Sequence, residues 1–157
     1  MEEDILAAAP RLKAIMHAAG TVKAVVTPAV WRRGIRVTGA RKPLGKGVAE
    51  TALGFTITAV KNMWQLTANT RAGEWHKDRD KTRELYELTV GVVGASQAGR
   101  YYIQLLRNFD VNILLFDPTI SSEEAEALGT RKVELEELLR ESDVVSLHAP
   151  SLPSTRH

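Results

Sequence analysis

Two short apolar runs joined by an amphipathic segment constrain the fold of this sequence more than any other feature. Leu88–Val93 (LTVGVV) ends at Gly94, and apolar residues then recur at helical spacing as far as Phe109. Val111–Phe116 (VNILLF) is apolar almost throughout, which is typical of a strand buried on both faces of a parallel sheet. A strand, a tight turn, a helix and a second strand in this order predict a right-handed βαβ unit.

The same alternation continues to residue 148 and predicts an α/β fold with a parallel sheet. Ser121 and Glu124 have the spacing of a capping box, and Gly129 suits the end of the short helix that they begin. A brief strand is expected at residues 132–133. The pattern then predicts a helix and a fourth strand: Glu134–Glu141, with Leu135, Leu138 and Leu139 facing inward, and Asp143–His148.

The first half of the sequence is also predicted to be α/β, with too few elements to cover both faces of a sheet. In its first 47 residues we expect two short strands, at Leu12–Met16 and Ile35–Thr38, with a short helix between them at Pro28–Arg33. A loop is expected at residues 39–47. A long helix is expected from Val48 to about Asn69. Its predicted buried face consists of Ala52, Phe55, Ala59, Met63 and Leu66.

Charge divides the sequence near its middle. Basic residues exceed acidic residues over positions 1–80, and the reverse holds over positions 81–157. We therefore expect two domains, 1–83 and 84–157, joined at the polar stretch 71–83. The basic residues are not interleaved with aromatic residues, so no nucleic-acid partner is expected.

Composition excludes several classes of protein. The 157 residues are 44% apolar and 25% charged, which is ordinary for a globular chain. Because the sequence has no cysteine, it can form no disulfide, thiolate zinc site or cysteine nucleophile, and we expect no metal site. No apolar run reaches the roughly 18 residues of a membrane span, and the first residues are acidic, so we expect no membrane partner and a cytoplasmic location.

The turn Gly94–Gly99 (GASQAG) is the main candidate site, because it lies between a predicted buried strand and an amphipathic helix. There it takes the place of G-x-G-x-x-G, whose glycines allow a sharp turn and close packing and whose N–H groups face a pyrophosphate. Ser96 takes the place of the middle glycine. Its Cβ narrows the gap through which the backbone approaches a phosphate, but its hydroxyl can donate a hydrogen bond to that phosphate. The alternative interpretation is a structural turn without a ligand.

Asp117 ends the next predicted strand, 18 residues after Gly99. A carboxylate there can accept hydrogen bonds from both ribose hydroxyls and repels a 2′-phosphate, which favours NAD over NADP. The alternative is an aspartate that starts a turn before Pro118. At the carboxyl edge of the fourth strand, three further residues are expected to line the cofactor cleft: His148, Ala149 and Pro150.

Six basic residues lie between Trp31 and Ala49 with no acidic residue among them: Arg32, Arg33, Arg36, Arg41, Lys42 and Lys46. A solvated helix end and loop would explain this cluster. The alternative is a positive field that draws in an anionic substrate. The nearby loop 18–21 can offer N–H groups to a carboxylate, or it is simply a turn between a strand and a helix.

Segments across nearly the whole chain together resemble the D-isomer-specific 2-hydroxyacid dehydrogenases, the family of phosphoglycerate dehydrogenase, hydroxypyruvate reductase and formate dehydrogenase. The resemblance rests on the order and spacing of LKAIMHAAGT (12–21), RRGIRVT (32–38), VAE (48–50), GEW (73–75), ELYELTVGVVGASQAGR (84–100), FDP (116–118), SDVVSLHAP (142–150) and PST (153–155). It implies a partial Rossmann-type parallel sheet in residues 84–157. Residues 1–83 would be part of a flavodoxin-like α/β substrate domain.

The resemblance also implies roles for particular residues. NAD would be held at its pyrophosphate by Gly94, Ser96, Gln97, Ala98 and Gly99, at its ribose by Asp117, and against a cleft wall of His148, Ala149 and Pro150. The carboxylate of a 2-hydroxy or 2-keto acid would face the loop of Ala19, Gly20 and Thr21. The helix that begins at Val48 would contribute to the interface of a homodimer.

The sequence departs from the family pattern at Lys23-Ala24, where Asp-Asn is frequent, and at Leu44, where Asn is frequent. The catalytic Arg, Glu and His of the family follow the segment that matches residues 142–150. The resemblance therefore implies an internal fragment that has no catalytic residue and turns over no 2-hydroxy acid. The alternative is an NAD-sensing dimeric binding protein with the same fold, like the C-terminal-binding co-repressors.

Overall fold

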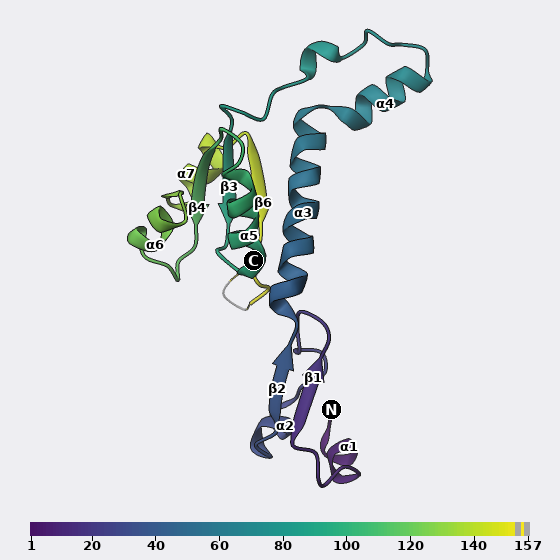
Figure 1. Cartoon of the computed structure of the whole chain (residues 1–157), viewed down its shortest axis with the longest axis vertical. Helices are drawn as coiled ribbons and strands as arrows, with labels where there is room; N and C mark the ends of the chain where they lie inside the picture. The colour runs from purple at the N-terminus through teal and green to yellow at the C-terminus, as the bar shows by residue number, and fades with distance from the viewer. Residues whose placement is uncertain (153–154, 156–157) are drawn as a thin grey trace. The chain divides into compact units, whose positions relative to one another are not determined.

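A computed structural model describes residues 1–152 and residue 155 (Figure 1). Pro153 and Ser154 of the PST segment lie outside the described residues. The chain forms two compact units, residues 1–45 and residues 46–157. This division differs from the boundary predicted near residue 83, because the long helix of the middle region contributes its buried residues to the core of the second unit.

The first unit is a small α/β arrangement with a parallel pair of strands. Its elements are α1 (Glu3–Ala7), β1 (Ala14–His17), α2 (Pro28–Arg32) and β2 (Arg36–Gly39). Pro28 occupies the first turn of α2, where its missing N–H costs no hydrogen bond. The core of this unit consists of Leu6, Ala29, Val30 and Ile35. Both strands lie within one residue or two of their predicted positions.

The long helix was predicted incorrectly at both ends. The helix α3 spans Arg41–Val60, so it begins seven residues before Val48 in the stretch predicted as a loop. Pro43 lies in its first turn, where proline is tolerated. Asn62 then adopts a left-handed conformation (φ 51°) and separates α3 from α4 (Met63–Arg71).

The predicted buried face of this helix was wrong at Phe55 and Met63, which are exposed, and right at Ala52, which packs on the core of the second unit. Phe55 is 61% exposed, whereas Ala49 and Thr56 are buried. The face that packs on the second unit's core also includes Ala52, Leu53, Ile57 and Val60. The apolar pattern of the sequence did not predict this face, because the face contains a threonine. The Thr56 hydroxyl can be buried because it makes hydrogen bonds within the protein.

A four-stranded parallel sheet forms the second unit. After the short 3-10 helix η1 (Arg79–Lys81), the elements are β3 (Thr89–Val93), α5 (Gln97–Leu106), β4 (Asn112–Phe116), α6 (Ser122–Ala127), β5 (Arg131–Lys132), α7 (Leu135–Glu141) and β6 (Val144–Leu147). The strands lie in the order β5-β4-β3-β6. The capping box of Ser121 and Glu124 forms as predicted, with hydrogen bonds in both directions.

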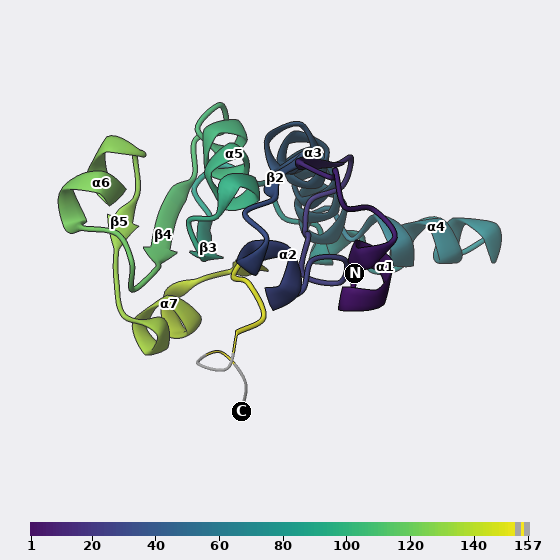
Figure 2. The same cartoon turned by 90° about the horizontal axis from the view of Figure 1, so that it is seen from below.

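Helices cover both faces of this sheet, and Figure 2 shows α5 and α7 on opposite sides of the strands. Val90 and Val92 pack with α5, whose Tyr102, Ile103 and Leu106 are buried. On the other face, Leu138 of α7 packs with Leu114. Leu139 was predicted to face inward but is 56% exposed. Among the helices in the described residues, none is both long enough and apolar enough to span a membrane.

The strand order places a topological switch point between β3 and β6. The chain leaves β3 towards β4 on one side, whereas β6 pairs with β3 on the other side. Ligands of open α/β sheets bind at the carboxyl ends of the strands at such a point. The turn that begins at Gly94 and the segment that begins at His148 both lie there.

Candidate functional site

The turn after β3 is held tightly against the segment after β6. Gly94 adopts φ +99°, and a Cβ at this position would lie 2.7 Å from the Ala149 nitrogen. A Cβ at Gly99 would lie 2.2 Å from the Gly94 carbonyl oxygen and 3.2 Å from the His148 Cβ. Both glycines are therefore required by close approach of backbone, at the two positions where the sequence predicts that requirement.

Ser96 is the N-cap of α5. Its Oγ accepts a hydrogen bond from the Gly99 N–H at 3.3 Å. Gln97 and Ala98 occupy the next two positions. The backbone N–H groups in the first turn of a helix have no carbonyl acceptor within the helix. The positive end of the helix dipole lies at the same place. This end of the ten-residue α5 has the donors that a pyrophosphate needs.

Asp117 points its carboxylate at the turn. Its Oδ2 accepts from the Ala95 N–H at 2.7 Å, and its Oδ1 accepts from the Thr119 N–H at 2.8 Å and the Thr119 hydroxyl at 2.6 Å. Burial raises the pKa of Asp117, but the hydrogen bonds from Thr119 and Ala95 and the charge of Arg100 outweigh it, so the net pKa is lowered. Asp117 is thus an anion that joins the end of β4 to the turn.

His148 is half-buried beside α5. Its Nε2 lies 2.9 Å from the Ser146 Oγ, and its ring centroid lies 5.2 Å from that of Tyr102. Burial lowers the pKa of His148, so its ring is neutral at physiological pH. Of the three predicted cleft residues, His148 and Ala149 contact the glycine turn, whereas Pro150 is exposed.

Arg100 also belongs to this site, although it was not predicted from the sequence as a site residue. Its Nε donates to the Ala95 carbonyl at 3.0 Å, and its charge acts on Asp117. The two side chains therefore hold the backbone of Ala95 on both sides of its Cα, Asp117 at the N–H and Arg100 at the carbonyl. A basic residue directly after the last glycine of the turn was the available signal.

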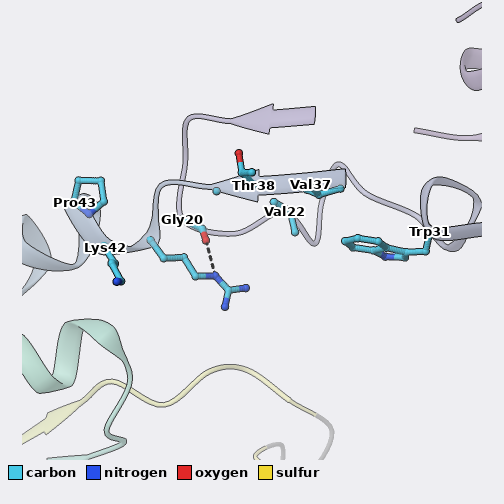
Figure 3. Close-up of a pocket in the computed structure, with 9 residues that line it drawn as sticks. Gly20, Val22, Trp31, Val37, Thr38, Lys42 and Pro43 are labelled. Atoms are coloured by element: carbon cyan, nitrogen blue, oxygen red, sulfur yellow. Dashed lines mark hydrogen bonds between the residues drawn. The ribbon is translucent and has the colours of Figure 1, made fainter. Parts of the chain in front are cut away.

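A pocket of about 510 Å³ lies in the first unit at the carboxyl ends of β1 and β2 (Figure 3). Gly20 of the predicted substrate loop lines it, and the Arg41 Nε donates to the Gly20 carbonyl at 3.1 Å. Ala19 and Thr21 make hydrogen bonds with nearby backbone N–H groups. The Ala19 carbonyl accepts from the Ala40 N–H at 3.0 Å, and the Thr21 hydroxyl accepts from the Lys23 N–H at 3.4 Å.

The basic cluster of the sequence separates into members with different surroundings. Arg41 and Lys42 line the pocket. Arg32 pairs with Glu3 at 2.9 Å, and Arg33 donates to the Leu6 carbonyl. Lys46 lies over the Tyr101 ring, 5.7 Å from its centroid. Only part of the cluster is therefore placed to attract an anion into the pocket.

The sheet order, the glycine turn and the acidic residue after β4 define a dinucleotide-binding α/β domain. Residues 53–157 match the family model of the D-isomer specific 2-hydroxyacid dehydrogenase, NAD binding domain. The chain belongs to this family, as its sequence predicts. The matched region is the NAD-binding domain of the family, so its cofactor is NAD.

The relatives agree with this assignment. The chain is 36% identical to the D-3-phosphoglycerate dehydrogenase of Methanocaldococcus jannaschii over 98% of its own length and 30% of that protein. It is 30% identical to the enzyme of that name from Mycobacterium tuberculosis, over 99% of the chain and 29% of that protein. The D-lactate dehydrogenase of Aquifex aeolicus, solved with NAD and lactic acid, superposes with a TM-score of 0.82 at 29% identity and covers 100% of this chain and 47% of its own.

The chain thus spans about 30% of the length of the curated relatives it matches. The residues described above fit the cofactor of the family. The end of α5 offers N–H donors, the turn between β3 and α5 contains no bulky side chain, and a carboxylate stands beside it.

Proposed function

We propose that this chain is part of an NAD-dependent oxidoreductase that transfers hydride between NAD(H) and a 2-hydroxy or 2-keto acid. The hydrogen bond between the Asp117 carboxylate and the Ala95 N–H carries the proposal, because it brings the acid of β4 to the glycine turn of β3. The named relatives are dehydrogenases, which favours this function over an NAD-sensing co-repressor.

The cofactor site is proposed to work through four kinds of contact. Gln97 and Ala98 offer N–H groups to the pyrophosphate, and the Ser96 hydroxyl keeps its hydrogen for a phosphate oxygen. Asp117 keeps one lone pair on Oδ2 for a ribose hydroxyl, and rotation of the Thr119 hydroxyl frees a second acceptor on Oδ1. Its negative charge repels a 2′-phosphate. His148, Ala149 and Pro150 form the cleft wall. When bound, the nicotinamide supplies the hydride chemistry.

The substrate side is proposed to lie in the pocket of the first unit. The loop of Ala19, Gly20 and Thr21 would receive the carboxylate of the acid. Arg41 and Lys42 supply positive charge to the same pocket, which suits an anionic substrate. In this proposal residues 1–83 belong to the substrate domain and residues 84–157 to the NAD-binding domain.

We also propose that the complete protein is a homodimer that uses the exposed face of α3 and α4. Phe55 and Trp64 are 61% and 59% exposed, and their rings contact each other at 6.3 Å between centroids. Exposed aromatic residues of this size are typical of protein interfaces. Sedimentation velocity of the complete protein measures its oligomeric state and tests this proposal. A protein that sediments as a monomer at a concentration of tens of micromolar would contradict it.

Titration with reduced cofactors tests the proposed function. Adding the chain to NADH should raise the nicotinamide fluorescence to saturation at one NADH per chain. NADPH should bind at least about tenfold more weakly, because Asp117 repels its 2′-phosphate. Equal affinity for the two cofactors, or no saturable change with NADH, would contradict the proposal.

A further inference from the structure

The Arg100 side chain reaches back from α5 to the turn that precedes this helix. Its Nε donates to the Ala95 carbonyl at 3.0 Å, and the Asp117 Oδ2 accepts from the N–H of the same residue at 2.7 Å. The N and O atoms of one residue are at most about 3.6 Å apart, so the Arg100 Nε lies within about 9 Å of the Asp117 Oδ2. The guanidinium and the carboxylate are therefore neighbours on one turn.

At this separation the two charges still act on each other. Salt screens exposed charges only beyond the Debye length, which is about 10 Å at 0.1 M ionic strength. Burial raises the pKa of Asp117, whereas the hydrogen bonds from Thr119 and Ala95 and the charge of Arg100 lower it. The cation therefore acts at the place where the proposed function puts the adenosine ribose.

Arg100 keeps further hydrogen-bond donors after its contact with Ala95. A guanidinium also carries N–H groups on its two Nη atoms. In the part of the chain that the structure describes, these groups make no hydrogen bond or ion pair, and the side chain is only partly buried. A planar fork of such donors matches the oxygens of a phosphate group.

A phosphate on the 2′ oxygen of the ribose would meet two opposite charges here. If Asp117 accepts hydrogen bonds from the ribose hydroxyls, this phosphate lies beside its carboxylate and is repelled. The neighbouring Arg100 guanidinium attracts the same phosphate. NAD has an uncharged hydroxyl at this position. The two side chains therefore oppose each other for NADP and not for NAD.

We propose that Arg100 is a specificity-determining residue, whose guanidinium attracts the 2′-phosphate of NADP and so limits the preference for NAD that Asp117 sets. This inference rests on the proposed function, because it requires the ribose to lie at Asp117. Asp117 then determines which cofactor binds more tightly, and Arg100 determines by how much.

Titration of Arg100 variants with NADH and NADPH at about 0.1 M salt tests the inference, and the ratio of the two affinities is the deciding quantity. Arg100→Met removes the charge and keeps an unbranched side chain, so NADPH affinity should fall about threefold or more relative to NADH affinity. Arg100→Lys loses the planar contact with Ala95 but keeps the charge, so both affinities should fall and their ratio should stay near that of the parent. A purely structural role at the turn would lower both affinities together in both variants.

A second background and a control complete the test. In Asp117→Ala, where the repulsion is absent, adding Arg100→Met should again weaken NADPH binding about threefold or more relative to NADH binding. Arg107→Met is the matched control, because Arg107 is the exposed C-cap residue of the same helix and its loss changes the net charge equally. This control should leave the ratio unchanged.

A ratio that agrees within about twofold between the parent and Arg100→Met would overturn the inference, and so would an equal change in Arg107→Met. If the parent binds neither cofactor, the proposed function fails and the inference fails with it. If the parent binds NADH and the ratio does not respond to Arg100, the inference alone fails.

Discussion

Gly99→Ala is the most informative single substitution, because it inserts one methyl group between the turn and the helix. The new Cβ would lie 2.2 Å from the Gly94 carbonyl oxygen, whereas ordinary contact begins at 3.4 Å, so α5 must move by about 1 Å. Such overpacking costs about 1–3 kcal/mol. Alanine is favoured over glycine in a helix by about 1 kcal/mol, which offsets part of this cost. The net loss of unfolding free energy is therefore about 1 kcal/mol.

The loss of cofactor affinity should exceed this modest loss of stability. Gln97 and Ala98 move with the helix, and their N–H groups no longer meet the pyrophosphate at hydrogen-bond distance. Weakening two charge-assisted bonds lowers NADH affinity about tenfold or more.

Urea unfolding and NADH fluorescence titration on the same preparation measure the two effects. Gly54→Ala in α3 is the matched control, because nothing lies within 4 Å of a Cβ there, and it should raise stability slightly and leave NADH affinity unchanged. A Gly99→Ala variant that binds NADH as the parent does would refute the reasoning.

Three further predictions concern the acid, the core and the histidine. Asp117→Ala should weaken NADH binding about tenfold and abolish the preference over NADPH in parallel titrations, because the ribose loses its acceptor; a retained preference would contradict the role of Asp117. Leu138→Ala, at a fully buried position, should cost about 2–5 kcal/mol in urea unfolding, and the exposed Leu139→Ala less than about 0.5 kcal/mol; equal costs would show that α7 packs differently. Burial lowers the pKa of His148 below 6.5, so the folded state binds fewer protons than the unfolded state below that pH. Stability should therefore be full above pH 6.5 and decline as the pH falls through the folded pKa; His148→Gln should remove that part of the decline in urea midpoints, and the exposed His76→Gln should not.

Local patterns predicted the sheet and its connections well. The two central strands, β3 and β4, formed where the largely apolar runs occur, because burial on both faces of a parallel sheet requires such runs. The Ser121 capping box needs only residues three apart, and it formed as expected. The position of Asp117 followed from the length of a βα unit.

Features that depend on distant contacts were not predictable. The stretch 39–47 contains glycine and proline and resembles a loop, yet α3 begins within it, because the first turn of a helix makes few demands on its residues. The exposure of Phe55 and the burial of Thr56 follow from packing with Tyr102, 46 residues away. The contact of Arg100 with Ala95 depends on the conformation of the turn itself.

The amide ¹H–¹⁵N spectrum of the chain during NADH titration tests the cofactor site most directly. The largest shift changes should fall on Gln97 and Ala98, with Ala95 also affected because its N–H is bonded to Asp117. Largest changes elsewhere, with the residues of the turn unmoved at saturation, would contradict the assignment of this site.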